Sequence, residues 1–135
     1  MWRRSNSKKI DPEIATRRFS TEIEITIFRI LQEAVLNTAR HSNAKNVFIN
    51  MRSKNDGIVV EIEDDGDGFD IHSVFSEAAG YNRTGRGLGL LGMKERASLI
   101  GGRLRICSSK DSGTRVTLRI PVDSIRREDD KGPDS

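Results

Sequence analysis

The segment that most constrains this chain is the glycine-rich stretch at residues 85–96, GRGLGLLGMKER. Glycines at positions 85, 87, 89 and 92 allow positive φ and close backbone approach, and helix-forming residues follow them. Consecutive N–H groups in such a loop can point at an anion just ahead of a helix N-terminus. The segment therefore predicts a phosphate-binding loop leading into a helix over 88–100, although glycine repeats also occur without a ligand.

An acidic and glycine-rich segment, DDGDGF at residues 64–69, precedes it. The pattern DxGxG puts the Asp64 carboxylate at the end of an apolar strand, and Gly66 and Gly68 keep side chains out of the space beside it. A carboxylate accepts hydrogen bonds from amino groups such as N6 of adenine, whereas a plain acidic turn needs no ligand. An EF-hand is excluded because no glutamate stands at the twelfth loop position. Asp65 and Asp67 are expected to face solvent.

Apolar residues recur every three or four positions over 22–40, which predicts an amphipathic helix. A polar stripe borders this apolar face, and it contains Glu33, Asn37, Arg40 and His41. The apolar face itself contains Ile23, Ile27, Ile30, Leu31, Ala34, Val35 and Thr38.

Segments 46–52 and 58–63, joined by a turn at 54–57, predict a β-hairpin, and strands are also expected at 103–108 and 114–121. Residues 71–84 show neither period and are expected to form a mobile loop. This order of elements predicts an α/β fold, a two-layer α/β sandwich whose mixed or mostly antiparallel sheet has helices on one face. Residues 1–18 are expected to be a basic arm or the remnant of an upstream segment, 19–122 the domain, and 123–135 a disordered polar tail.

The bulk composition excludes several classes of protein. With 135 residues, 35% of them hydrophobic, the chain is expected to form one soluble domain; no signal peptide is expected, because the first residues lack an apolar segment, and no apolar run has membrane-spanning length. The single cysteine, Cys107, cannot form a disulfide within the chain. The net charge of +3 arises in residues 1–20, and one Trp and one Tyr offer little stacking surface, so no nucleic-acid partner is expected.

Four segments in this order resemble the N, G1, G2 and G3 boxes of the GHKL ATP-binding (Bergerat-type) fold: RILQEAVLNTARH at 29–41, DDGDGF, the glycine-rich stretch, and SGT at 112–114. The resemblance covers about 19–122. The patterns RIxQEAxxNxxxH and GLGLxGMxERA are similar to those of catalytic domains of sensor histidine kinases whose partner regulators carry LuxR-type DNA-binding domains.

The resemblance implies that the domain binds ATP and Mg²⁺. It implies that Asn37 is the magnesium ligand and that Glu33 is a general base or a group that supports the metal ligands. Arg83 in the loop is a weaker candidate for phosphate contact. The remaining residues implied to contact nucleotide are Arg40, His41, Asp64, Gly66, Gly68, Gly85, Arg86, Gly87, Leu88, Gly89 and Thr114, the last with Gly113 in the G3 box.

The resemblance also implies an activity, transfer of the γ-phosphoryl group of ATP to a histidine on a helical dimerisation domain, with a response regulator as indirect partner. We expect this domain to make no contact with a membrane, and we expect a cytoplasmic location. The chain contains only His41 and His72, and neither has the setting of a phosphoacceptor. Two alternatives remain open: an anti-sigma-factor serine kinase of the same fold, and an ATP-gated binding module without transferase activity.

Overall fold

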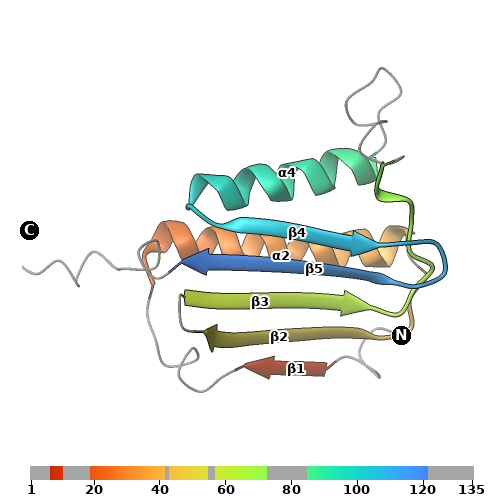
Figure 1. Ribbon diagram of the computed structural model, residues 1–135, viewed down its shortest axis with the longest axis horizontal. Coiled ribbons are helices and arrows are strands. Elements are labelled where there is room, and N and C mark those ends of the chain that lie inside the picture. The colour runs from red at the N-terminus through yellow and green to blue at the C-terminus, as the bar shows by residue number, and fades with distance from the viewer. Residues whose placement is uncertain (1–6, 11–18, 42, 55–56, 73–84, 122–135) are drawn as a thin grey trace, which may run out of the picture.

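The computed structural model describes residues 7–10, 19–41, 43–54, 57–72 and 85–121. These residues form two layers, a sheet and the helices α2 and α4, which lie on the same face of it (Figure 1). The elements are β1 (Ser7–Ile10), α2 (Thr21–His41), β2 (Val47–Lys54), β3 (Gly57–Asp64), α4 (Gly85–Leu99), β4 (Arg103–Ser108) and β5 (Thr114–Pro121). The predicted two-layer α/β sandwich is therefore confirmed.

The sheet has five strands in the order β1-β2-β3-β5-β4. Strands β2, β3, β5 and β4 pair antiparallel, whereas β1 pairs parallel with β2 at the edge, so the sheet is mixed, as predicted. The sequence analysis did not anticipate β1, because its four residues lie within the segment expected to be a basic arm.

The core lies between the sheet and the helices because side chains alternate along each strand. Asp64 follows the inward positions of β3 and therefore also faces the helices. The buried inward residues include Ile58, Val60 and Ile62 of β3, Val116, Leu118 and Ile120 of β5, Ile23, Ile27, Ile30 and Ala34 of α2, and Leu90, Met93 and Ala97 of α4.

Helix α2 has a clear start signal in the sequence. Ser20 is its N-cap, and its hydroxyl accepts a hydrogen bond from the Ile23 N–H at 3.3 Å. The Glu24 carboxylate reaches back to the Phe19 N–H at 3.2 Å, and Phe19 is buried in the core. These contacts fix the direction in which α2 crosses the sheet.

The expected boundary of the second helix was wrong at its N-terminus. The helix α4 begins at Gly85 rather than at Leu88, so Gly85, Gly87 and Gly89 have helical backbone instead of forming a loop ahead of the helix. At the other end, Gly101 has φ 73° and the Gly102 N–H bonds to the Ala97 carbonyl at 2.8 Å, as in a Schellman motif.

Several sequence-based expectations lie outside the described residues. They concern the greater part of the loop at 71–84 with Arg83, the turn residues 55–56, most of the basic arm, and the tail at 123–135. Within the described ranges, no helix is long and apolar enough to cross a membrane.

Candidate nucleotide-binding site

The Asp64 carboxylate is buried, with 6% of the residue exposed, at the end of β3. The hydroxyl of Thr38 on α2 donates to its Oδ2 at 2.9 Å, and the Gly66 N–H donates to its Oδ1 at 2.8 Å. A carboxylate can accept about four hydrogen bonds, so this one keeps capacity for further donors. The structure thus brings the predicted pair Asp64 and Gly66 together and fixes an acceptor between the sheet and α2.

Thr38 is a site residue that the sequence analysis missed, because it falls on the apolar face of α2 and was assigned to the core. It is indeed buried, but its hydroxyl lies within hydrogen-bond distance of both the Asp64 carboxylate and the Ala34 carbonyl, the latter at 3.1 Å. It was the only hydroxyl among the residues assigned to that face. A buried hydroxyl needs a partner, and that requirement was the signal available in the sequence.

Asn37, the residue before Thr38, is 9% exposed, and no hydrogen bond joins its side chain to a described residue. Buried amides are normally hydrogen-bonded, so this one is suited to a ligand that supplies the missing partner. Its amide oxygen is a hard donor of the kind that Mg²⁺ accepts, together with phosphate oxygens. The described residues contain no cluster of three or more His, Cys, Asp or Glu that could hold a metal by itself, so a bound Mg²⁺ would depend on such phosphate oxygens.

Helices α2 and α4 approach each other closely at Glu33 and Gly89. A Cβ atom built on Gly89 would collide with Oε2 of Glu33, so only glycine leaves room for that carboxylate in its present position. Glu33 therefore lies against the first turns of α4, whose N-terminal N–H groups have no partner within the helix. The structure brings together the helix N-terminus and the acidic residue of the predicted stripe.

The start of β5 closes the site beside Asp64. Gly113 has φ 77°, and a Cβ atom there would collide with the backbone carbonyl oxygen of Asp64. Ser108, which the sequence analysis did not single out, donates to the Gly113 carbonyl at 2.9 Å, lies 2.9 Å from the Thr114 hydroxyl, and accepts from the Phe69 N–H at 2.9 Å. The predicted hydroxyl of Thr114 is thus buried and already paired.

Gly68 also permits a close approach of two backbones. It has φ 69°, and a Cβ atom there would collide with the carbonyl oxygen of Ser109. The loop after β3 and the loop between β4 and β5 therefore touch, and the N–H of Asp111 bonds to the carbonyl of Asp67.

Asp65 was expected to face solvent, and it is exposed, but its carboxylate is also engaged. Its Oδ1 accepts from the N–H groups of Lys45 and Asn46, both at 2.9 Å, and its Oδ2 accepts from the Asn46 side-chain amide. These donors, the Asn46 N–H foremost, hold the pKa of Asp65 below its usual value. Asp65 thereby ties the start of β2 to the end of β3.

The structure describes the other predicted site residues only in part. Arg40 is exposed on α2, and no ion pair joins it to a described residue. His41 ends α2, and residues 85–88, with Arg86 and Leu88, form the first turn of α4, but their side chains lie outside what the structure describes.

A hollow of about 520 Å³ lies between Lys54, Gly57 and Pro121. It is at the opposite end of β3 from Asp64 and contains none of the predicted site residues. Another, of about 480 Å³, is lined by Gly113 and Thr114 among others, but Asp64 is not one of its lining residues.

The fold and these contacts define a class of domain, an α/β sandwich with a buried carboxylate at a strand end that faces a helix layer, in which a buried amide has no hydrogen-bond partner among the described residues. Residues 22–124 match the family model described as "Histidine kinase-, DNA gyrase B-, and HSP90-like ATPase", so the chain belongs to this family of ATPases.

Individual relatives agree with the family. The chain is 38% identical over 108 residues to an uncharacterized sensor-like histidine kinase of Chloroflexus aurantiacus, covering 79% of this chain and 17% of that protein. Among solved structures, the histidine kinase domain of a blue-light activated histidine kinase from Erythrobacter litoralis EL346 has a TM-score of 0.69 at 19% identity, covering 88% of this chain and 52% of that one. The ATP binding domain of PrrB from Mycobacterium tuberculosis has a TM-score of 0.57 at 25% identity, covering 72% and 67% of the two chains.

Proposed function

We propose that this domain binds Mg²⁺-ATP and supplies its γ-phosphoryl group to a histidine of a separate helical dimerisation domain, as the catalytic part of a sensor histidine kinase. The observation that carries the proposal is the buried Asp64 carboxylate, held by Gly66 and by Thr38, whose neighbour in sequence, the buried Asn37, has no side-chain hydrogen bond to a described residue. Family membership and the sensor-like histidine kinase relative support it. The chain spans about a sixth of that relative's length, so the sensing part and the acceptor belong to sequence that the comparison does not cover.

Base and phosphates are assigned to different groups in this proposal. Asp64 accepts a hydrogen bond from the N6 amino group of adenine, because two donors already orient its carboxylate. Gly66 and Gly68 belong to the loop that follows Asp64. Asn37 holds Mg²⁺ through its amide oxygen, and the ion neutralises phosphate charge when bound. Arg40, His41, Arg86 and the N-terminal N–H groups of α4 at Gly85, Gly87, Leu88 and Gly89 are assigned to the phosphates and ribose.

The reaction requires little covalent chemistry from this chain. A bond forms between the acceptor imidazole nitrogen and the γ-phosphorus, the bond from that phosphorus to the β,γ-bridging oxygen breaks, ADP leaves, and the imidazole proton is lost. Glu33 lies against the start of α4 and is the candidate to accept that proton or to orient the groups around the metal. Positioning and charge stabilisation supply the rest.

The proposed partners follow from the same assignment. They are a dimerisation domain with the acceptor histidine, in the same protein or in trans, and a response regulator of the LuxR-type class that receives the phosphoryl group from it. The proposed location is the cytoplasm, where ATP is available.

The decisive experiment adds a purified dimerisation helix pair from a related kinase to this domain with γ-labelled ATP and Mg²⁺. We expect acid-labile label on the added domain and none on this chain alone. Asn37→Ala should lower transfer far more than it lowers ADP affinity in the absence of Mg²⁺, whereas Asp64→Asn should weaken nucleotide binding itself. Asn50→Ala on the outward side of β2 is the matched control and should change neither.

Acid-stable label on a serine of a partner would identify a serine kinase instead. Nucleotide binding without transfer to any acceptor would identify a binding module. A melting temperature that does not move in saturating Mg²⁺-ATP would contradict nucleotide binding altogether, because ligand at about 100 times Kd adds roughly 2.7 kcal/mol of stability.

A further inference from the structure

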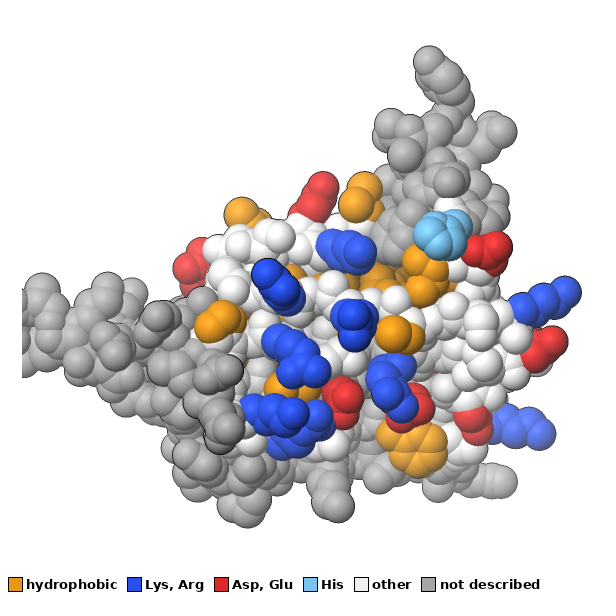
Figure 2. Space-filling view, viewed as in Figure 1, with side chains coloured by type: hydrophobic (Ala, Val, Ile, Leu, Met, Phe, Trp, Pro, Cys, Tyr) orange, Lys and Arg blue, Asp and Glu red, His pale blue; other side chains and the backbone are white. Residues whose placement is uncertain are grey.

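The outward face of the sheet, opposite the helices, is rich in arginine. Figure 2 shows basic side chains gathered in the middle of this face. Cross-strand register and alternation place two glutamates, Glu61 and Glu63, on it as well. The basic residues at outward positions of β2, β4 and β5 are Arg52, Lys54, Arg103, Arg105, Arg115 and Arg119.

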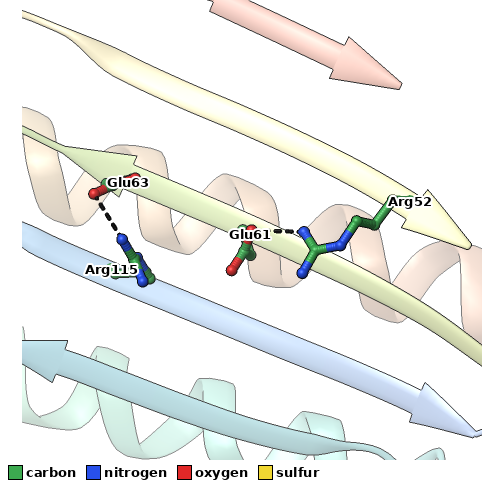
Figure 3. A network of polar contacts seen from close by, with 4 residues as sticks. All are labelled: Arg52, Glu61, Glu63 and Arg115. Carbon is green, nitrogen blue, oxygen red and sulfur yellow. Dashed lines mark hydrogen bonds and ion pairs between the residues drawn. The ribbon is translucent and has the colours of Figure 1, made fainter. Parts of the chain in front are cut away.

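Both glutamates lie on β3 and are already engaged by arginines of the two neighbouring strands, β2 and β5. Arg52 pairs with Glu61 at 2.7 Å, and Arg115 pairs with Glu63 at 3.2 Å (Figure 3). These two pairs account for the acidic charge of the outward face and for two of its arginines.

Arg103, Arg105 and Arg119 form the remaining group, here called the arginine row. All three are exposed, and no ion pair joins them to a described residue. Arg103 lies directly opposite Arg119 in the β4–β5 register, and Arg105 is the next outward residue along β4. Like charges directly opposite one another destabilise a sheet, so folding does not account for this arrangement.

We propose that the arginine row is a docking surface for an acidic protein segment. Directly opposite side chains lie about 5 Å apart and alternate residues along a strand about 6.7 Å apart, which is also the spacing of alternate side chains in an extended peptide. Guanidinium groups bind carboxylates in a bidentate manner that lysine cannot reproduce. The three arginines of the row are therefore suited to bind carboxylates. An extended segment lying along β4 with carboxylates at alternate positions matches the spacing of Arg103 and Arg105, and Arg119 lies beside Arg103 on the neighbouring strand.

The neighbouring residues favour a protein partner over a nucleic acid. Glu61 and Glu63 lie on β3, one strand beyond Arg119, so a phosphate backbone that continues across the face meets these carboxylates, whereas a short acidic segment lying along β4 does not reach them. Among the described residues, the aromatic side chain of this face belongs to Phe48, which lies on β2 opposite Glu63, on the far side of β3 from the arginine row, so this part of the chain offers bases no stacking partner beside the row.

This surface is separate from the proposed nucleotide site. The arginine row points away from the helices, whereas Asp64 and Asn37 lie between the sheet and α2. The inference therefore does not depend on the proposed function, and nucleotide should not compete with the acidic segment.

The test measures binding of fluorescein-labelled oligo-glutamate to the whole chain by anisotropy at low ionic strength. The variant Arg103→Gln/Arg119→Gln removes two arginines without a carboxylate partner, and the matched control Arg52→Gln/Arg115→Gln removes two that are paired. We expect the first variant to weaken binding about tenfold and the second by less than about threefold. The first variant should also melt no lower than the parent, because it removes a like-charge pair.

Four results would overturn the proposal. They are no binding of oligo-glutamate by the parent chain, equal losses in the two variants, displacement of the peptide by saturating Mg²⁺-ADP, and tighter binding of single-stranded DNA of equal charge. A clear fall in the melting temperature of Arg103→Gln/Arg119→Gln would show that these arginines stabilise the fold, and would also contradict it.

Discussion

The Thr38 hydroxyl and the Asp64 carboxylate, 26 residues apart in sequence, are joined by a buried hydrogen bond of 2.9 Å. This bond connects α2 to the end of β3, and it fixes one carboxylate oxygen on the side of the helices while the Gly66 N–H fixes the other. Thr38 is therefore a positioning residue for the group that we assign to adenine. It acts through Asp64, since its own hydroxyl is engaged with protein atoms.

The first prediction concerns Thr38→Val, which keeps the shape of the side chain and removes the donor. A buried hydrogen bond to a charged group contributes about 1.5–3 kcal/mol, so the variant should melt lower and should bind ATP about tenfold more weakly. Thr38→Ser restores the donor and should recover most of the affinity. Calorimetric titration with ATP and with GTP measures both affinity and base preference.

A purely structural role for Thr38 would give a different pattern. Thr38→Val would then lower the melting temperature while ATP affinity and the preference for adenine stayed at parental values. That result would show that Asp64 is oriented without the hydroxyl.

The second prediction concerns Gly89→Ala in α4. The added Cβ meets the end of the Glu33 side chain, a flexible group that can move aside, and alanine favours a helix over glycine by up to about 1 kcal/mol. We expect a melting temperature close to that of the parent but slower phosphoryl transfer to the added acceptor domain, because the Glu33 carboxylate is displaced.

Gly92→Ala is the matched control for this change. It lies in the same helix, and an added Cβ there meets no atom within 4 Å. It should raise the melting temperature and leave transfer unchanged. Parental transfer by Gly89→Ala would mean that the position of Glu33 does not matter.

The third prediction concerns Gly113→Ala at the start of β5. The backbone has φ 77° at this position, and the added Cβ would collide with the carbonyl oxygen of Asp64, which cannot move independently of β3. We expect a loss of at least about 2 kcal/mol of stability, measured by urea unfolding. A loss below about 0.5 kcal/mol would show that Gly113 does not lie against the Asp64 carbonyl in solution.

Much of this architecture could be predicted because local patterns and tertiary packing agree. The apolar period over α2, the alternation in the four long strands and the paired glycines after α4 each specify their own element. The start of α4 could not be predicted in the same way, since glycines at 85, 87 and 89 disfavour a helix, and the contact of Gly89 with Glu33 of α2 is a tertiary one. The strand β1 depends on pairing with β2, which is a non-local contact, and its four residues are too few to show a strand pattern in the sequence.

The residues of the candidate site also fall into those that could be predicted from the sequence and those that could not. Asp64, Asn37 and Glu33 could be predicted as site residues because motif spacing carries them, and the structure joins Asp64 to Thr38, the residue after Asn37 in α2. The residues that hold the site, Thr38 and Ser108, were missed because each acts through a partner distant in sequence. Hydrogen bonds of this kind are set by the fold and leave no periodic signal.

The last prediction is the pH dependence that Asp65 confers. The Asn46 N–H, the Asn46 side chain and the Lys45 N–H stabilise its charged form, so its pKa in the folded state lies below the unfolded value of about 3.9. A depressed carboxyl pKa contributes stability that is fully present above the unfolded value and is lost as pH falls through the folded value. Asp65→Asn should therefore melt lower than the parent at neutral pH, and the gap between the two curves should begin to close below about pH 4 and disappear as pH falls through the folded pKa of Asp65. Asp67→Asn, in the same loop, is the control and should follow the parent throughout. A gap between parent and Asp65→Asn that stayed constant from neutral to strongly acidic pH would show that the effect is one of shape, not of charge.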